Sequence, residues 1–249
     1  MSGHSKWSQI KRQKGANDAK RGAIFTKVGR EIAIAARQGG GDPEANYRLR
    51  LAMEKARSVN MPADNIKRAI ERAAGGDKAE QFEEIVYEGY GPGGVAILVE
   101  AATDNRNRTV ADVRSMFTKA GGQLAGAGAV AWQFEPRGVV AVSPNGQDAD
   151  EIALAAIDAG AEDVDTTGDL VEVLTSPADV EQVRKALESQ GIPIESAEVA
   201  MQAKTPVEVT PDVVRQNLRL IEHLEDLDDV QRVTANFELP DEILAEATA

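Results

Sequence analysis

The residues of this sequence that could do chemistry are the basic side chains gathered at its start. Residues 1–30 contain eight Lys and Arg residues and one acidic residue, Asp18. The eight are Lys6, Lys11, Arg12, Lys14, Lys20, Arg21, Lys27 and Arg30. Contact with a polyanion is the simplest electrostatic reason for such a cluster, because cations neutralise the phosphates of a nucleic-acid backbone. A solvated surface with its usual charges is the alternative.

Two other groups could add to such a contact. Trp7 could stack on a base or a nucleotide sugar, although a hydrophobic anchor against the first helix explains it equally well. Arg106 and Arg108 lie in residues 104–109, between a predicted strand and a predicted helix, where helix N-terminal amides and two guanidinium groups could hold an anion. Ordinary helix capping is the slightly favoured alternative for this segment.

The charge of the chain is strongly separated along its length. Residues 1–75 contain sixteen Lys and Arg and seven Asp and Glu, a net charge of +9. Residues 76–249 contain the other twelve and thirty-four, a net charge of -22, which together give the formal -13 of the whole chain. The acidic part could serve solubility or could face basic protein partners, and the sequence does not choose between them.

Enzymatic chemistry finds little support in the composition. The chain has no Cys, and its two His residues, His4 and His223, stand far apart without metal-ligand spacing. Its acidic runs are typical of solvated faces and isolate no catalytic pair. We therefore predict a protein that is not an enzyme and needs no cofactor or metal. The first thirty residues resemble neither a signal peptide nor a membrane span, so we expect a cytoplasmic location and no membrane contact.

Three helices are predicted before residue 76. Helical periodicity runs over 18–38, 42–59 and 62–75, with Asp18 and the Asp42-Pro43 pair as helix starts and glycines as stops. On a helical wheel of about 100° per residue, four cations of the first helix share one stripe opposite its apolar face. These four are Lys20, Lys27, Arg30 and Arg37. Arg21 falls on the apolar side but stays among the candidate contacts.

The remaining sequence predicts mixed strands and helices. A hairpin over 82–101, a helix over 109–120 and a strand at 129–134 come first. A β-α-β-β-α-β order follows, which begins with a strand at 138–142 and ends near residue 202. A helix over 211–224 and one strand over 230–237 follow, and a lone strand needs a sheet elsewhere.

These elements predict an α+β protein of three domains. A basic helical domain with a flexible N-terminal arm covers 1–78, and two small α/β, ferredoxin-like domains follow it. The second is discontinuous, covering 79–128 plus 207–249, and the third, covering 129–206, is inserted in it.

Several motifs of this sequence closely resemble the YebC/PmpR family. They are MSGHSKW at 1–7, KRQK at 11–14, KR at 20–21, FTK at 25–27, NMP at 60–62, YEGYGPGG at 87–94 and TDNRNRT at 103–109. The resemblance covers essentially the whole chain. It implies a cytoplasmic, three-domain protein, helical first and α/β afterwards, which regulates transcription by binding DNA. Related mitochondrial proteins activate translation of cytochrome oxidase, and bacterial relatives are linked to stalled ribosomes, so the resemblance also makes RNA a rival ligand.

The residues themselves leave the ligand open. No predicted helix presents Asn, Gln or Arg as an obvious reader of base edges in duplex DNA. Aromatic residues are only 4% of the chain, so RNA binding would depend on backbone and shape. A protein-interaction adaptor that uses only its acidic domains is a third possibility. We predict a nucleic-acid-binding regulator. A DNA-binding transcriptional regulator is the first interpretation, and a ribosome- or RNA-associated translation factor is the alternative. The sequence does not determine the oligomeric state.

Overall fold

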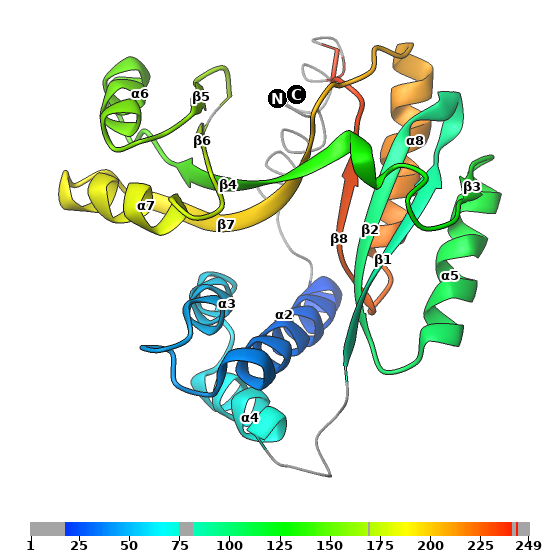
Figure 1. The fold of residues 1–249 in the computed structure, drawn as a ribbon, viewed down its shortest axis with the longest axis horizontal. Helices are drawn as coiled ribbons and strands as arrows, with labels where there is room; N and C mark the ends of the chain where they lie inside the picture. Colours follow the sequence, from blue (N-terminus) through cyan, green and yellow to red (C-terminus); the bar gives the residue numbers. More distant parts are fainter. Residues whose placement is uncertain (1–17, 75–81, 169, 241–242, 244–249) are drawn as a thin grey trace.

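The computed structural model describes residues 18–74, 82–168, 170–240 and 243. A helical unit comes first, and two antiparallel sheets with helices follow it (Figure 1). The predicted α+β class, helical first and mixed afterwards, is confirmed. The division at residues 78, 128 and 206 stays a prediction, so the three parts are called the helical, second and third units here.

The helical unit consists of α2 (Asp18–Gly39), α3 (Tyr47–Ser58) and α4 (Ala63–Ala74). Their apolar stripes meet in one core, in which the side chains of Ile32 and Leu49 are fully buried. Burial of each such side chain stabilises the fold by roughly 1.5–3 kcal/mol.

The predicted start of the second helix at Asp42-Pro43 is wrong. Asp42 instead closes a turn by accepting a hydrogen bond from the amide of Glu44 at 2.9 Å. The helix begins at Tyr47 because Asn46 is a better anchor: its Oδ1 accepts from the amide of Leu49, and its Nδ2 donates to the carbonyls of Ala35 and Gly40. This contact also explains Gly39, since a Cβ there would lie 2.6 Å from the Asn46 side chain.

The second unit is built on a sheet of order β3-β1-β2-β8. Its strands are β1 (Glu83–Tyr90), β2 (Ala96–Thr103), β3 (Gln123–Leu124) and β8 (Val230–Ala235), with the short turn η2 (Pro92–Gly94) inside the first hairpin. Helices α5 (Arg106–Lys119) and α8 (Pro211–Glu225) pack on one face, where Phe117 of α5 and Leu220 of α8 share a core with Ile97 of β2. The C-terminal strand β8 pairs antiparallel with β2, so segments distant in the sequence share this sheet.

The third unit contains β4 (Phe134–Val142), α6 (Ala149–Asp158), β5 (Asp163–Asp165), β6 (Val171–Thr175), α7 (Val180–Ser189) and β7 (Ile194–Ala203). Its sheet has the order β5-β6-β4-β7 with every pair antiparallel. A β-α-β-β-α-β chain with this strand order has the ferredoxin-like topology. Both helices lie on one face, over the buried side chains of Val140 and Val173, and Leu187 of α7 belongs to the same core.

Two further local predictions are wrong. The strand predicted over 129–134 is a turn and the short helix η3 (Ala131–Gln133), because the buried carboxylate of Glu88 takes up backbone amides of this segment. Helix α5 begins at Arg106, three residues before its predicted start, because Asn105 is its N-cap and accepts from the amide of Arg108. Arg106 and Arg108 are therefore part of the helix.

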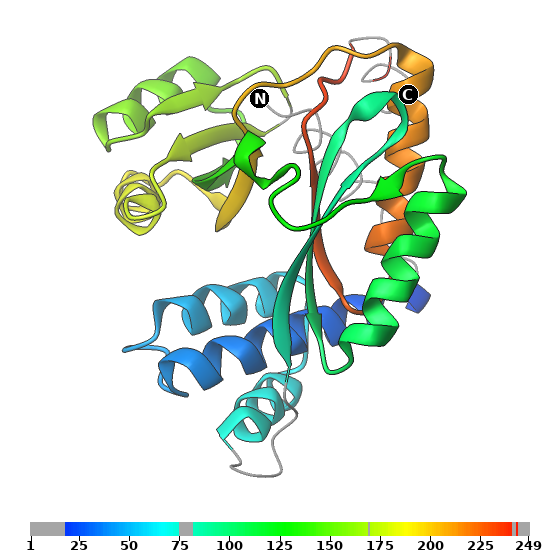
Figure 2. The ribbon, with the colours of Figure 1, turned by 45° about the vertical axis from the view of Figure 1, so that its right-hand side comes forward.

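The helical unit packs against both of the others. Figure 2 shows α2 crossing the foot of β1, β2 and β8, and α3 facing the third unit. Tyr47 of α3 packs on the core of the third unit, where Arg184 lies 3.9 Å from Glu54. Among the helices that the structure describes, none is long and apolar enough to cross a membrane.

Candidate nucleic-acid interface

Part of the predicted interface falls outside the described residues. Five of the twelve predicted contacts do so: Lys6, Trp7, Lys11, Arg12 and Lys14. Lys20 and Arg21 belong to the first turn of α2, and their side chains are not described. The structure therefore positions five of the predicted side chains: Lys27, Arg30, Arg37, Arg106 and Arg108.

Arg30 points into the junction between α2 and the second unit. Its side chain is 14% exposed, and its Nη1 donates to Asp229 Oδ1 at 2.8 Å and to the carbonyl of Asp228. Its guanidinium carbon lies 5.3 Å from the centre of the Phe82 ring, within cation–π range. The helical wheel correctly placed Arg30 on the side of α2 that faces away from the core of the helical unit. That side is not open to solvent, because the second unit covers it.

Lys27 lies at the same junction, one turn earlier in α2. Its Nζ donates to the carbonyl of Glu225, the last residue of α8. A cation at a helix C-terminus satisfies an otherwise unpaired carbonyl and interacts favourably with the helix dipole. Lys27 and Arg30 therefore fasten the helical unit to the loop after α8.

Asp229 is the centre of this junction. Its side chain is 8% exposed and accepts hydrogen bonds from Arg30, from Arg108 Nη2 at 2.8 Å, from Thr109 at 2.7 Å and from Thr103 at 3.2 Å. Burial by itself raises the pKa of Asp229, but the hydrogen bonds from Thr109 and Arg108 and the charge of Arg30 outweigh it and hold the pKa below its ordinary value. Asp229 thus stays ionised between two arginines.

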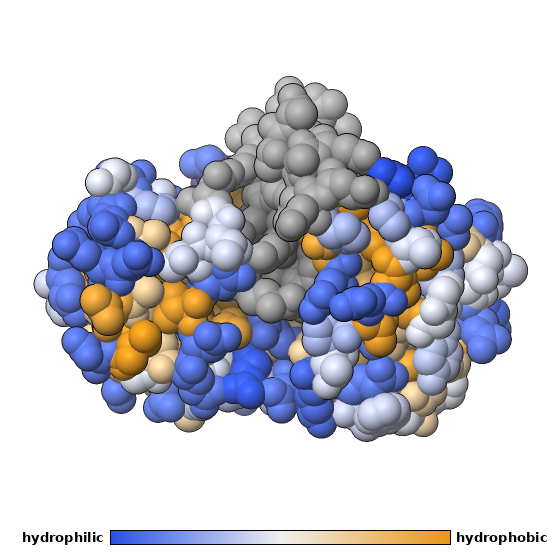
Figure 3. Space-filling view, turned by 90° about the horizontal axis from the view of Figure 1, so that it is seen from above, coloured by the Kyte–Doolittle hydropathy of each residue, from blue (hydrophilic) through white to orange (hydrophobic). Residues whose placement is uncertain are grey.

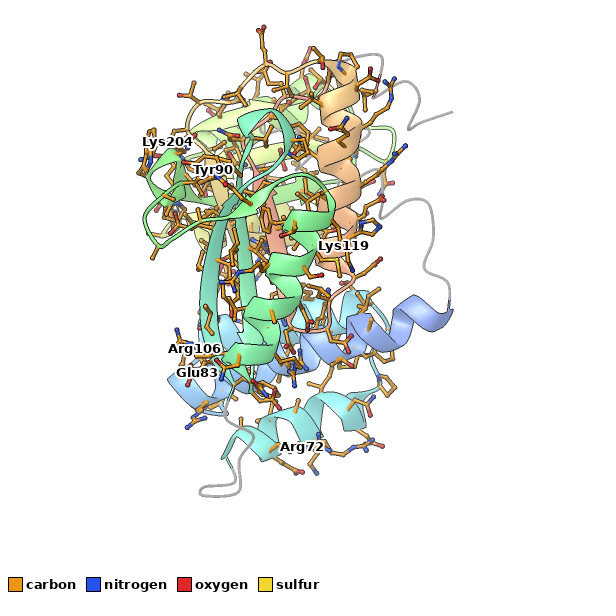
Figure 4. The ribbon with its side chains drawn as sticks, turned by 90° about the vertical axis from the view of Figure 1, so that its right-hand side faces the viewer. Arg72, Glu83, Tyr90, Arg106, Lys119 and Lys204 are labelled. Atoms are coloured by element: carbon orange, nitrogen blue, oxygen red, sulfur yellow. The ribbon has the colours of Figure 1, made fainter. Side chains whose placement is uncertain are left out.

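The predicted anion site around Arg106 and Arg108 has the wrong charge balance for phosphate. The pocket beside Arg108 is lined by two arginines, Arg30 and Arg108, and by five aspartates. These are Asp104, Asp112, Asp226, Asp228 and Asp229. Arg106 lies at the foot of α5, near Glu83 (Figure 4), and its Nε is 3.8 Å from a carboxylate oxygen of Glu83. In this arrangement, ordinary ion pairing and capping account for both arginines.

Acid weakens these ion pairs in a predictable direction. The pKa of Glu84 is also held below its ordinary value, because the hydrogen bond from Arg48 and the Arg48 charge together outweigh the effect of burial. An acid with a lowered folded-state pKa contributes stability above its unfolded-state pKa, and this contribution is lost as the pH falls through the folded-state value. We expect the free energy of unfolding, measured in urea, to fall steadily below about pH 4. The fall should be smaller in Asp229→Asn, and an identical pH dependence would contradict this assignment.

Three exposed cations of the helical unit have no carboxylate partner among the described residues. Arg37 is exposed in the last turn of α2, and Arg57 is exposed in the last turn of α3. Neither pairs with a carboxylate among the described residues. Arg68 of α4 is also exposed, and within the described part of the chain it donates to the backbone carbonyl of Asp64 and to the side-chain oxygen of Asn65, neither of which is charged. Sequence reasoning missed Arg57 and Arg68, although both lie off the apolar stripes of their helices.

Other chemistry has little support in the described part of the chain. Within residues 18–74, 82–168, 170–240 and 243, no group of His, Asp or Glu could hold a metal ion. The fold and the charged surfaces together define a three-part α+β protein whose basic helical unit is seated on two acidic sheet units.

Comparison with known proteins identifies the family. Residues 5–76 match the TACO1/YebC protein N-terminal domain, and residues 82–237 match the TACO1/YebC second and third domain. The chain belongs to the TACO1/YebC family, which confirms the resemblance seen in its motifs.

Its relatives are similar over nearly their whole length. A "Probable transcriptional regulatory protein" of Rubrobacter xylanophilus is 53% identical over 247 residues, or 99% of each chain. One from Chloroflexus aggregans is 54% identical over 247 residues, or 98% of each chain. The crystal structure of a conserved hypothetical protein from Aquifex aeolicus has a TM-score of 0.86 at 46% identity, covering 91% of this chain and 94% of that one. The names of the curated relatives support a regulatory role.

Proposed function

We propose that this protein is a non-enzymatic, cytoplasmic regulator that binds DNA through the cations of its first 75 residues. The observation that carries this proposal is the charge separation, +9 in residues 1–75 against -22 in the rest. A segment so basic in an acidic chain is attracted to phosphates, while the acidic units repel the same backbone and so orient the molecule on it. The relatives' names as transcriptional regulatory proteins agree with this proposal.

The contact set that we propose differs from the full set of predicted residues. Lys27, Arg30 and Arg108 are engaged within the protein, so the proposed contacts are the cations of the first twenty-one residues together with Arg37, Arg57 and Arg68. These cations would position the protein on the backbone without reading its sequence. Structured RNA offers the same phosphates, and the exposed aromatic residue Trp132 favours RNA as a second candidate ligand.

Two arginines of α2 give a matched test of this contact set. Replacing Arg37, which is exposed, by Ala is expected to reduce the slope of log affinity against log salt concentration by about 1, with stability unchanged. Replacing Arg30 by Ala is expected to leave that slope unchanged and to lower the free energy of unfolding by about 2 kcal/mol, because Asp229 loses a buried partner. Fluorescence anisotropy with a labelled DNA duplex and urea unfolding measure the two effects. The opposite pattern would show that Arg30 contacts the ligand.

A further inference from the structure

Trp132 is an exposed aromatic side chain that neither the core nor the basic interface explains. It lies in η3, at the connection between the second and third units, and is 68% exposed, more than any other large apolar side chain of the described chain. Its indole Nε1 donates to the carbonyl of Ala129 at 3.2 Å, and the phenol of Tyr90 donates to the same carbonyl at 3.0 Å. The polar edge of the indole is therefore satisfied within the protein, while most of the side chain remains open to solvent.

The turn that holds Trp132 is fixed by a buried carboxylate. Glu88, 6% exposed, accepts hydrogen bonds from the amides of Gly128, Val130 and Ala131 at 2.6, 2.7 and 2.8 Å. Burial raises the pKa of Glu88, but the three backbone hydrogen bonds lower it by more than burial raises it. The net pKa is therefore below its ordinary value, and the carboxylate stays charged. Gly128 has a φ of +84°, a conformation that favours glycine. Such a support holds the ring in place before any ligand arrives.

A cation is attached to the same turn. Lys204 is exposed, and its Nζ donates to the carbonyl of Trp132 at 2.9 Å, while its amide donates to the carbonyl of Gln133. Figure 4 labels Tyr90 and Lys204 at one edge of the molecule, and Tyr90 and Ala203, the neighbour of Lys204, pack in one apolar cluster. The Lys204 ammonium therefore lies beside the backbone of Trp132, the residue that carries the exposed ring.

The segment that carries this turn contains no acidic residue of its own. The stretch between Asp112 and Glu135 contains no Asp or Glu, and it is the longest such stretch in a chain with 41 acidic residues. Gly126 and Gly128 add no side chain, and a Cβ at either position would meet nothing within 4 Å. A phosphate backbone can therefore approach the ring closely and without repulsion from this segment.

The other exposed apolar side chains lie in a different environment. Leu154 and Ile157 of α6 are 64% and 55% exposed, but the exposed carboxylates of Asp150, Glu151 and Asp158 lie on the same helix. Figure 3 shows apolar side chains gathered over the third unit and over the second within a mainly hydrophilic surface. Nucleic acid would be repelled from α6, which makes Leu154 a suitable control.

We propose that Trp132 is a platform on which an unpaired nucleobase stacks, with Lys204 beside it to contact the neighbouring phosphate. An exposed aromatic face with an adjacent cation is the common arrangement for binding single-stranded nucleic acid, because every base has a π-face. This inference rests on the proposed function and adds a second contact, far along the chain from the basic first residues. It assigns a single-stranded segment, in RNA or in opened DNA, to the junction of the second and third units.

The chain offers a direct optical test. It contains two Trp residues, so Trp132 is the sole tryptophan of the full-length Trp7→Phe variant. A single-stranded uridine oligonucleotide, titrated to saturation at low salt, is expected to quench this emission, whereas a blunt DNA duplex is expected to quench it much less. Anisotropy of a labelled oligonucleotide reports saturation independently. Unchanged Trp132 emission at saturation would overturn the inference and would leave a protein surface as the ligand of the ring.

Substitutions give a second measurement on the full chain. Trp132→Ala is expected to weaken oligonucleotide binding roughly 5- to 150-fold, whereas Trp132→Phe should retain most of the affinity. Leu154→Ala removes a comparably exposed apolar side chain from the acidic helix α6 and should leave binding unchanged. Wild-type affinity in Trp132→Ala, with binding still salt-dependent, would refute the platform while the proposed function stands. No binding of any oligonucleotide by the unmodified chain would refute both.

Discussion

Replacing Asp229 by Asn is expected to lower the free energy of unfolding by about 3 kcal/mol, because the change leaves the largely buried Arg30 without its counter-charge. Asp229 joins three parts of the fold: α2 through Arg30, the start of α5 through Arg108 and Thr109, and the end of β2 through Thr103. An amide can accept some of these hydrogen bonds but cannot balance either guanidinium. Urea unfolding followed by circular dichroism measures the change.

A neighbouring aspartate supplies the control for this prediction. Asp226 lies in the same loop but is exposed, so Asp226→Asn should change the free energy of unfolding by less than about 0.5 kcal/mol. If Asp229→Asn were as stable as Asp226→Asn, the ion pairs of Asp229 would contribute nothing to the attachment of the helical unit. Asp229→Asn should bind nucleic acid no more weakly than the wild type, since the substitution removes a negative charge.

Neutralising the N-terminal cations should have the largest effect on binding. The combined replacement of Lys11, Arg12, Lys14 and Lys20 by Ala is expected to reduce the salt slope of nucleic-acid affinity by about 3 to 4, because each lost phosphate contact removes about 0.9. At low salt the affinity should fall on the order of 100-fold. Anisotropy titrations of a labelled DNA duplex and a labelled RNA at several salt concentrations measure both quantities.

The matched control removes four cations from the second and third units. Arg114, Lys185, Arg215 and Arg219 lie on α5, α7 and α8, and replacing all four by Ala changes the net charge by the same amount. If position determines binding, this control should keep the salt slope of the wild type. An equal reduction of the salt slope in the two variants would mean that the net charge of the chain governs the affinity, and not the position of the cations in the first residues.

Part of the charge separation read from the sequence serves contacts inside the protein, which the sequence did not predict. Lys27, Arg30 and Arg48 of the helical unit make hydrogen bonds or ion pairs with the second unit, and Glu54 approaches Arg184 of the third. The basic unit is thus held partly by attraction to the acidic units of its own chain. A helical wheel could not predict these contacts. It identifies the side of a helix that faces away from its own core, but it does not show whether another unit packs on that side.

Local signals predicted the secondary structure well where they are self-contained. Apolar periodicity and glycine stops located α2 and α4, and the alternation of strands and helices predicted the third unit with its ferredoxin-like order. One prediction was wrong because a distant residue decides the backbone. Glu88, about 40 residues earlier, converts the expected strand at 129–134 into the turn that presents Trp132. Nothing in the local sequence indicates that contact.

The candidate site was less predictable than the fold. Basic composition indicated a class of ligand to test, but it could not separate cations engaged inside the protein, such as Arg30, from those on the surface, such as Arg37. It also missed Arg57 and Trp132, since a lone arginine or tryptophan is common in any helix or turn. Exposure and ion pairing, which depend on how the three units pack, are needed to distinguish them.

If the first 75 residues of this acidic chain attract phosphates, as we propose, a single salt titration will show it. The full chain should bind labelled DNA or RNA at low ionic strength, and the log of its affinity should fall linearly with log salt concentration, with a slope of about -5 or steeper. A chain that binds neither nucleic acid at low salt, or that binds with a slope near zero, would contradict this proposal.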